Sequence, residues 1–515
     1  MMRTLTKVLC ATLVILILSS CKKTLDEKNL SYQPLNPADI DLRAGEWKPI
    51  LLSGPDEFPV VGPLPVTSPA YIAELNEIKS WQANLSDKQR DLIRYWSAGS
   101  VLRWNEILRE LVAKHNIPPY QNEDGSYPFP SAANPFAYPV FPFSNPPYAS
   151  RAYAYVSAAQ YDALISCYHY KTDFQRQPPH KLDPSIQALI PKTDLPSYPS
   201  EDGAVIGATV ELLKLLFPAD QAFIQQKAEE NRLYRIMAGA NVRSEIEAGE
   251  ELGKAVAQKF TTRAKSDGAG NAIGSASIWA DLETQTSAKG EVPWISQESP
   301  KRPPMLPLFG RVKTFLFDSA TLESIMPPPP PSTSSDQFEK ELAEVKFYSN
   351  NPTTERIKIV QFWADGINTP TPPGHWNKIA ADEMATRGFS EARCARNFAL
   401  LNMAMMDAAI SCWKTKFLYF NPRPSQVDPS IKTLTGLPNF PSYTSGHSTF
   451  SGAAATFLGH IFPEKNEMFN TMANEASLSR LYGAIHYRSD IEEGLLCGQR
   501  VGAFAVARAK SDGAE

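Results

Sequence analysis

The chain has 515 residues, 43% hydrophobic and 21% charged, a composition typical of a folded protein of two to four domains. Its formal net charge of −4 is spread along the chain without a basic patch, which excludes nucleic acid as an expected partner. The 44 prolines fall in clusters, which indicates loops and linkers between helical blocks.

Residues 1–21 are predicted to be an export signal. Arg3 and Lys7 precede an apolar run, Val8 to Leu18, which is shorter than the roughly 20 residues that a membrane span needs. The following Leu18-Ser19-Ser20-Cys21 resembles a bacterial lipobox, in which the cysteine becomes the lipidated first residue. We therefore expect a bacterial membrane lipoprotein of the cell envelope, facing the periplasm or the exterior and held only by a lipid on Cys21. An uncleaved membrane anchor is the alternative.

The rest of the chain alternates between irregular and helical stretches. Residues 22–80 are rich in proline and lack periodicity, which predicts a spacer and an irregular N-terminal arm. Residues 81–265 place apolar side chains at three- and four-residue spacing and are predicted to form a first helical bundle. Residues 266–336, which include Pro327–Pro331, are predicted to be a linker. Residues 337–515 are again helical, and strand patterns are nearly absent, so the chain is predicted to be all-α.

The two helical blocks repeat each other at a fixed offset of 245 residues. The segment Asp162-Ala163-Leu164-Ile165-Ser166-Cys167 corresponds to Asp407-Ala408-Ala409-Ile410-Ser411-Cys412, and Pro196-Ser197-Tyr198 corresponds to Pro441-Ser442-Tyr443. No gap is needed between about residues 149 and 257. The chain is therefore predicted to contain two pseudo-symmetric helical bundles.

The two copies differ at a few positions that suit chemistry. The differing pairs, second copy first, are Arg423 and Pro178, Gly446 and Glu201, His447 and Asp202, and His486 and Asn241. The first copy thus lacks both histidines and one arginine, and it has two acids where an anion would lie. We expect the active site in the C-terminal bundle and a scaffold role for the first.

The first two segments of this expected site combine cations with a helix N-terminus. Lys416 and Arg423 lie at a helix end and in the following Pro-bounded loop, and the planar guanidinium suits a tetrahedral oxyanion. Ser445 and Gly446 precede a small apolar helix, where backbone N–H groups favour an anion and glycine allows close approach. Each segment alone is explained as well by a solvated charge or by a helix cap.

The third segment holds Arg480, His486 and Asp490. Residues four apart share a helix face, so Asp490 can accept a hydrogen bond from one imidazole nitrogen and aim the other at an anion. The three segments occur together in the copy that differs from its partner at these positions. Together they predict an oxyanion-binding site.

The combined pattern K-x6-RP, SGH and SR-x5-H-x3-D resembles that of the PAP2 and vanadium-dependent haloperoxidase superfamily. Thr444 stands where the usual middle motif has proline directly before the serine. The segments Phe362–Gly366 and Pro372–Trp376 are similar to the haloperoxidase-type branch, which has two helical bundles in one chain. Simple acid phosphatases of the superfamily have one bundle and about half this length.

The resemblance implies a role for each residue. Lys416, Arg423 and Arg480 would neutralise the equatorial oxygens of vanadate or phosphate, helped by Ser445 and the N–H of Gly446. His486, oriented by Asp490, would be the axial vanadium ligand or the nucleophile that forms a phosphohistidine. His447 would be the acid–base residue on the opposite side. Trp413 and Phe440 match aromatic positions on the halide side, with ordinary core packing as the alternative.

Three functions follow as hypotheses. The first is a vanadium-dependent haloperoxidase-like enzyme with vanadate as cofactor and with peroxide and halide as small-molecule substrates. The second is a phosphatase without a cofactor, acting on phosphomonoesters or diphosphates. The third is a non-catalytic surface binding protein. Vanadate and phosphate suit the same ligands, so the residues leave the first two open, and the sequence carries no signal of oligomeric state.

Two further groups are expected to be structural. The cysteines Cys167, Cys394, Cys412 and Cys497 lie in apolar helical contexts without a spacing that marks a pair, and buried free thiols are expected. Asp407 has a counterpart in the first copy, so a structural role is favoured over one in orienting a cation.

Overall fold

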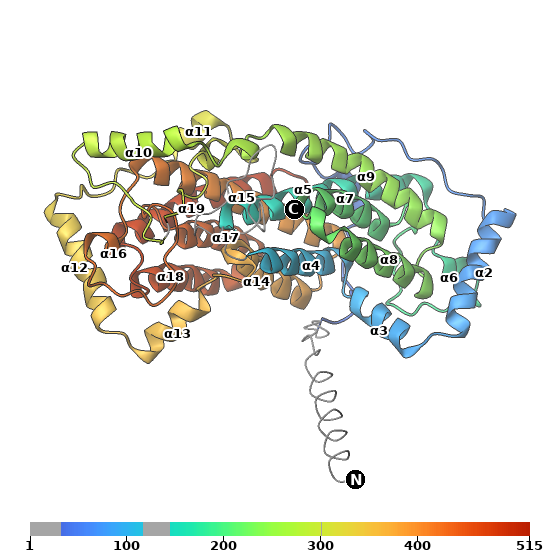
Figure 1. Cartoon of the computed structure of the whole chain (residues 1–515). Helices are drawn as coiled ribbons and strands as arrows, with labels where there is room; N and C mark the ends of the chain where they lie inside the picture. The colour runs from blue at the N-terminus through green and yellow to red at the C-terminus, as the bar shows by residue number, and fades with distance from the viewer. Residues whose placement is uncertain (1–31, 117–144, 300) are drawn as a thin grey trace, which may run out of the picture. The chain divides into compact units, whose positions relative to one another are not determined.

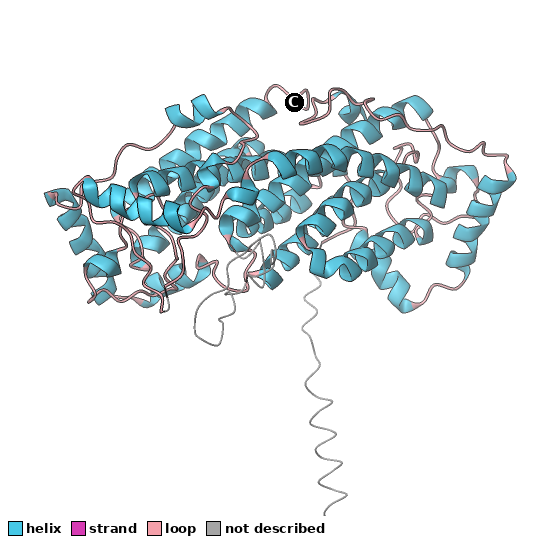
Figure 2. Cartoon of the chain, turned by 45° about the horizontal axis from the view of Figure 1, so that its top comes forward, coloured by secondary structure: helices cyan, strands magenta, loops and turns pink. Residues whose placement is uncertain are grey.

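The structure, a computed structural model, describes residues 32–116, 145–299 and 301–515. The predicted export signal and Cys21 lie outside the described residues. Within them the chain forms helices and short 3-10 turns and no strand (Figure 2), which confirms the all-α prediction. No helix of the described ranges combines the length and the apolar character that a bilayer crossing requires.

Residues 34–515 form one compact unit that holds both halves of the repeat. In Figure 1 the first half is blue to green and the second is yellow to red. The helices of the first half are α2 (Pro69–Ala83), α3 (Asp87–Trp96), α4 (Ser100–His115), α5 (Pro146–Phe174), α6 (Pro179–Leu182), α7 (Glu201–Leu216), α8 (Gln221–Met237) and α9 (Arg243–Ser266). Those of the second are α12 (Asp336–Asn350), α13 (Thr354–Phe362), α14 (Thr371–Arg387), α15 (Glu391–Tyr419), α16 (Pro424–Val427), α17 (Gly446–Ile461), α18 (Asn466–Tyr482) and α19 (Arg488–Ala509).

The repeat read from the sequence is visible in the helix boundaries. Helices α15, α17 and α18 begin and end 245 residues after α5, α7 and α8, respectively. For α7 and α17 the equal start follows from an equal capping residue, since Ser200 caps α7 and Ser445 caps α17. The expectation of two pseudo-symmetric helical bundles is therefore confirmed.

The repeat extends further towards the N-terminus than the sequence indicated. Most of helix α2 lies within residues 22–80, the stretch that is expected to be irregular. It is the counterpart of α12 in the repeat and is not part of a spacer. Glu77 of α2 binds Arg243, and Glu344 of α12 binds Arg488 in the same way. The apolar periodicity of α2 is weak, and the helix begins with Pro69 after its cap Ser68, which is why the sequence pattern does not reveal it.

The predicted linker is also structured in part, with α10 (Ala276–Ala288) and α11 (Ser319–Ser324). It contacts the second bundle as the N-terminal arm contacts the first. Backbone N–H groups of Phe315 and Leu316 donate to the Asp407 carboxylate, and those of residues 50–52 donate to Asp162. The structural role expected for Asp407 is confirmed, because its carboxylate holds the backbone of Phe315 and Leu316 and does not face the cations of the expected site.

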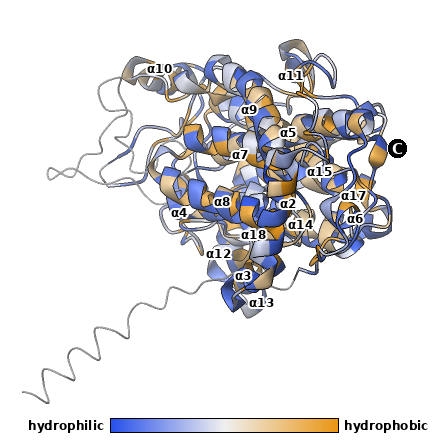
Figure 3. Cartoon of the chain, turned by 90° about the vertical axis from the view of Figure 1, so that its right-hand side faces the viewer, coloured by the Kyte–Doolittle hydropathy of each residue, from blue (hydrophilic) through white to orange (hydrophobic). Residues whose placement is uncertain are grey.

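The two bundles meet along α5 and α15, which pack against each other in the middle of the compact unit (Figure 1). A buried polar chain crosses this contact: Asn402 of α15 donates to Ser157 of α5 (3.0 Å), and Asn377 of α14 donates to Asn402 (2.7 Å). Buried amides that satisfy one another in this way fix the register of the helices. Helices at the surface carry both polar and apolar residues (Figure 3), as amphipathic helices around a core do.

Glycines set the closest helix contacts in both bundles. A Cβ on Gly498 of α19 would lie 2.1 Å from the carbonyl oxygen of Thr449 on α17, and one on Gly253 of α9 would lie 2.2 Å from that of Ala204 on α7. A side chain at either position would therefore push the two helices apart. The close packing holds the N-terminus of α17 beside the start of α19, where the site is built. The four cysteines of the described chain are buried and unpaired, as expected.

Candidate active site

The last turn of α15 carries the first buried cation. The Nζ of Lys416 donates hydrogen bonds to the carbonyl oxygens of Pro441 (2.8 Å) and Ser442 (2.9 Å), and also to that of Thr444. The helix stops three residues later because Phe420 adopts a left-handed conformation, with φ of 50°. Lys416 therefore links the end of α15 to the loop that leads into α17.

Arg423 lies in the loop that follows and is fully buried. Its Nε donates to the carbonyl oxygen of Phe440 (3.0 Å), and its Nη1 donates to that of Ile485 (2.7 Å). The same Nη1 lies 3.0 Å from Nε2 of His486. The guanidinium is thus fixed between two loops and directed at the histidine.

Helix α17 presents its N-terminus to these cations. Ser445 is its N-cap, and its Oγ accepts the N–H of Ser448 (3.3 Å). The backbone N–H of Ser445 donates to the carbonyl oxygen of Asp490 on α19 (2.9 Å), which ties the two helices together at this end. Gly446 opens the helix without a side chain, so its backbone is accessible at an end that attracts anions.

The third cation, Arg480, lies at the end of α18 and is 1% exposed. Its Nε donates to Oγ of Ser479 (2.8 Å), and its Nη2 donates to the carbonyl oxygen of Val360 (3.2 Å). Both partners are neutral. Within the described residues, none of Lys416, Arg423 and Arg480 forms an ion pair with a carboxylate.

His486 and Asp490 form a buried pair at the start of α19. Nδ1 of His486 lies 2.8 Å from Oδ2 of Asp490, which also accepts the N–H of Tyr487 (3.1 Å) and the hydroxyl of Ser442. An arginine can only donate, so the contact from Arg423 makes Nε2 of His486 an acceptor and places the ring proton on Nδ1. The lone pair of Nε2 therefore faces the cations.

Burial governs the charges of this group. It lowers the pKa of Lys416 to about 7, and it lowers the pKa values of Arg423 and Arg480 to about 10. Burial and then the charge of Arg423 hold the pKa of His486 well below its usual range. Burial raises the pKa of Asp490 to about 6, against the hydrogen bond from Ser442. A bound oxyanion would offset the desolvation of all three cations.

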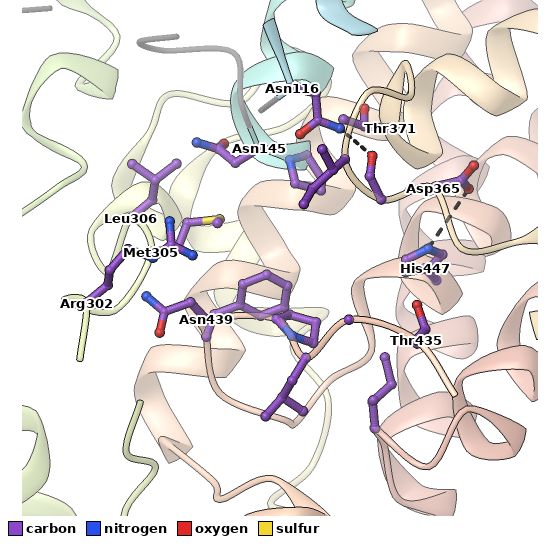
Figure 4. Close-up of a pocket in the computed structure, with 18 of the residues that line it drawn as sticks. Asn116, Asn145, Arg302, Met305, Leu306, Asp365, Thr371, Thr435, Asn439 and His447 are labelled. Carbon is purple, nitrogen blue, oxygen red and sulfur yellow. Dashed lines mark hydrogen bonds and ion pairs between the residues drawn. The ribbon is translucent and has the colours of Figure 1, made fainter. Parts of the chain in front are cut away.

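His447, the second residue of α17, faces the same space from the other side. Its side chain is 18% exposed, and its Nε2 lies 4.0 Å from Oδ2 of Asp365 (Figure 4). Asp365 is held in turn by Nδ1 of His375 (3.0 Å), whose ring stacks on Trp363 at a centroid distance of 4.6 Å. Burial, then the charge of Arg480, lowers the pKa of His447 well below its usual value. A neutral imidazole at this place can accept a proton.

Asp365 received no role in the sequence interpretation, although it belongs to a segment that carries the resemblance. The signal was weak, because a single acid in a loop far from the three motifs has no periodic or repeated context. Only the fold brings this loop, between α13 and α14, against the N-terminus of α17. Figure 4 shows Asp365 and His447 directed at each other.

The two aromatic residues expected on the halide side differ in position. Phe440 lines the cavity described below, and Nζ of Lys416 lies 5.0 Å from its ring centroid. Trp413 is fully buried behind it, at a centroid distance of 5.0 Å, and donates Nε1 to the carbonyl oxygen of Met305 (3.1 Å). Phe440 is therefore placed to meet a ligand, whereas Trp413 supports it.

A cavity of about 450 Å³ opens beside Arg480, one of the three cations. His447, Arg480 and Asp365 are among the residues that line it, and Figure 4 labels His447 and Asp365. Much of its wall is apolar and comes from the 302–306 and 435–440 loops: Pro303, Pro304, Met305, Leu306, Leu437, Pro438 and Phe440. A space of this volume is typical of sites for organic ligands.

Two buried nitrogen atoms at this point fit an oxyanion. Nη2 of Arg423 and Nε2 of His447 have no hydrogen-bond partner within the described part of the chain. Buried polar atoms without a partner are rare in folded proteins, since each costs about 1–3 kcal/mol. A tetrahedral oxyanion between them, in contact with Nε2 of His486, would accept a hydrogen bond from Nη2 of Arg423. It would also accept one from Nε2 of His447 when that nitrogen is protonated. The donors present therefore suit vanadate or phosphate.

Residues 397–511, which contain Lys416, Arg423, Ser445, His447, Arg480, His486 and Asp490, match the PAP2 superfamily. A stretch of 123 aligned residues is 35% identical to the vanadium chloroperoxidase of Curvularia inaequalis. This part of the chain is therefore similar to the PAP2 and vanadium haloperoxidase superfamily. The aligned stretch covers 18% of this chain and 20% of that relative, so the chain matches about a fifth of the chloroperoxidase's length.

The fold of the chain is similar to two solved structures. A bacterial vanadium-dependent iodoperoxidase matches with a TM-score of 0.58 and 24% identity, over 79% of this chain and 96% of that one. The holo form of a bacterial vanadium-dependent chloroperoxidase matches with a TM-score of 0.51 and 12% identity, over 71% and 92%. Both likenesses concern the fold. The resemblance expected from the sequence is confirmed over residues 397–511.

The structure brings together the site residues expected in the C-terminal bundle, with Trp413 one layer behind, whereas Cys21 lies outside the described residues. Their individual roles stay predictions. Lys416, Arg423, Arg480, His486 and the N-terminus of α17 will be called the oxyanion cradle.

Proposed function

We propose that this chain is a vanadium-dependent haloperoxidase-like enzyme, which uses peroxide to oxidise a halide at the oxyanion cradle. The observation that carries the proposal is the meeting of three buried cations without carboxylate partners at one neutral imidazole, His486. This combination favours a multiply charged oxyanion that also takes a nitrogen ligand. The two-bundle architecture and the likeness to the two haloperoxidase folds support the choice of vanadate.

The residues present assign the ligand positions. Lys416, Arg423 and Arg480 would hold the oxygens of vanadate, and Nε2 of His486 would be its nitrogen ligand. Asp490 keeps the proton of His486 on Nδ1, so that Nε2 stays available. Vanadate, when bound, supplies the Lewis acidity that makes peroxide electrophilic.

His447 manages the protons on the side of the cavity. In the overall reaction, H2O2 + X⁻ + H⁺ → HOX + H2O, a peroxide proton must leave and a proton must reach the departing oxygen. The imidazole of His447 is neutral and lines the cavity, so it accepts the first and returns it as the second. The carboxylate of Asp365, 4.0 Å away, stabilises the imidazolium in between.

The cavity indicates a further participant in this reaction. A halide ion and a peroxide molecule together occupy only a small part of about 450 Å³, since a water molecule takes about 30 Å³ in the liquid. The apolar wall suits a neutral organic molecule. We include in the proposal that an organic acceptor is halogenated while it lies in this cavity.

A phosphatase remains the second candidate, because the same cradle fits a phosphoryl group. His486 would then attack phosphorus through Nε2, the ester bond would break, and water would hydrolyse the phosphohistidine. The low pKa of His447 makes it a poor acid at neutral pH, so this activity would be greatest under acidic conditions.

One pair of assays separates the candidates. The soluble protein without residues 1–21 is assayed with vanadate, peroxide and bromide or iodide, and in parallel with a generic phosphate ester without vanadate. Halogenation that requires vanadate supports the proposal. Ester hydrolysis that vanadate inhibits supports the phosphatase instead. His486→Ala abolishes the activity in either case.

We also propose that the chain is exported and held at the cell envelope by a lipid on Cys21. The support is the charged start, the short apolar run and the small residues before this cysteine. Metabolic labelling with a fatty acid tests it: the full chain should incorporate label, and Cys21→Ser should not. Equal labelling of both would overturn it.

A further inference from the structure

The first bundle keeps three parts of the cradle. At the offset of 245 residues, Lys171 corresponds to Lys416 and Arg235 corresponds to Arg480. Ser200 corresponds to the N-cap of α17 and caps α7 in the same way, accepting the N–H of Gly203 (3.3 Å). Lys171 is fully buried and Arg235 is 8% exposed. Two buried cations therefore meet a helix N-terminus here as well.

In this bundle a carboxylate of the chain lies between the cations. Oε2 of Glu201 is 2.8 Å from Nζ of Lys171, and its Oε1 is 2.7 Å from Nη2 of Arg235. The corresponding residue in the second bundle is Gly446, which leaves this space open. The two oxygens of Glu201 thus contact Lys171 and Arg235. In the second bundle, the counterparts of these two cations would contact two oxygens of an oxyanion.

The position of the histidine ligand is changed as well. Asn241 stands in the place of His486, and its Oδ1 accepts Nε of Arg235 (2.7 Å). Its Nδ2 donates to Oε2 of Glu245 (3.1 Å), the counterpart of Asp490. An amide in this orientation offers no nucleophile and no basic nitrogen. The first cradle can hold an anion by charge but has no group for chemistry.

The charge of Glu201 persists at all ordinary pH values. Burial opposes its ionisation, but the charges of Arg235 and Lys171 outweigh burial and lower its pKa to about 2. Asp202 lies 2.9 Å from Nη1 of Arg235 through its Oδ2 and adds a second acid at the position of His447. The first cradle is therefore neutralised from within.

We propose that Glu201 is a built-in substitute for an oxyanion, closing a second tetrahedral-oxyanion site in the first bundle that takes phosphate or vanadate once this carboxylate is removed. The native chain accordingly binds oxyanion in one bundle only, and the first bundle is held together without one. This inference depends on the geometry of the first bundle and is independent of the reaction in the second.

Glu201→Gly, which reproduces the residue of the second copy, tests the inference. It is made in an Arg423→Ala background, so that the second cradle is disabled in variant and parent alike, and both are dialysed to equilibrium against labelled inorganic phosphate. The E201G variant should bind about one more phosphate per chain than its parent. Glu201→Gln should add none, because its amide fills the same space.

Asp202 opposes a second anion, so E201G with Asp202→Asn should bind phosphate more tightly than E201G alone. If both variants fold, by circular dichroism, and bind no more phosphate than the parent, the inference is overturned. If E201G does not fold, E201Q provides the test. Loss of the charge should lower the thermal unfolding midpoint of E201Q, and an unchanged midpoint overturns the inference. Failure of the haloperoxidase proposal affects parent and variants equally and leaves this comparison intact.

Discussion

Nδ1 of His486 lies 2.8 Å from Oδ2 of Asp490, and both side chains are 2% exposed. This pair fixes the ring proton on Nδ1 and leaves Nε2 for a ligand. We expect Asp490→Asn to lower vanadate affinity by about 10–100-fold, as the loss of an outer partner of a ligating histidine typically does. Glu245→Gln, at the equivalent place in the first bundle, is the matched control. A D490N affinity within twofold of the native value would contradict the assignment.

The charge of Lys416 predicts a pH dependence of oxyanion binding. Its pKa is about 7 in the buried cradle, and a bound oxyanion raises it because the anion favours the ammonium form. The contribution of this charge to affinity is complete below pH 7 and is lost as pH rises above 7, by up to about tenfold per pH unit. Sulfate, whose own charge is constant in this range, is the ligand of choice for calorimetry. In Lys416→Arg the dependence of affinity on pH should disappear. A dependence that persists in this variant would show that Lys416 is not its origin.

The contact between Asp365 and His447 predicts a change in the pH profile of the rate. The carboxylate favours the imidazolium, so Asp365→Asn should lower the pKa of His447 further. Because neutral His447 is the proton acceptor, the acidic limb of the kcat profile should move to lower pH, and kcat itself should fall by about tenfold or more. Vanadate affinity, measured separately, should change little. An unchanged profile would remove Asp365 from the mechanism.

Close helix packing predicts a stability effect at Gly498. A Cβ there would lie 2.1 Å from the carbonyl oxygen of Thr449, so Gly498→Ala must push α19 away from α17. We expect the free energy of unfolding to fall by about 1–3 kcal/mol in urea denaturation. Gly270→Ala, where no atom lies within 4 Å of the added carbon, should be neutral within about 0.5 kcal/mol. Equal stability of the two variants would contradict the packing argument.

Much of this arrangement was readable from the sequence, because the chain contains its own comparison. The offset of 245 residues predicted the paired helices, and the loss of His447 and His486 from the first copy located the cradle. The contacts of Glu201 could not be predicted from the sequence. Its position opposite Gly446 marked it as an acid near an anion site, but only the fold shows its two oxygens divided between Lys171 and Arg235.

Other features depended on long-range contacts that leave no local pattern. Asp365 reaches His447 because α13 and α14 place their connecting loop at the end of α17. Helix α2 was missed because its apolar positions are weakly periodic, and its identity rests on ion pairs such as that between Glu77 and Arg243. The cavity is built from loops. The course of these loops depends mainly on the packing of the helices that they connect, and their proline content predicts it only in part.

The central claim is that the second bundle binds one vanadate through His486 and the three cations and uses it for halide oxidation. The most direct measurement is a vanadate titration of the purified chain in which peroxide-dependent halide oxidation and bound vanadium are followed together. Activity should rise in proportion to bound vanadium and saturate at about one vanadium per chain, and His486→Ala should show neither. Saturation without halide oxidation, or equal binding by His486→Ala, would contradict the account.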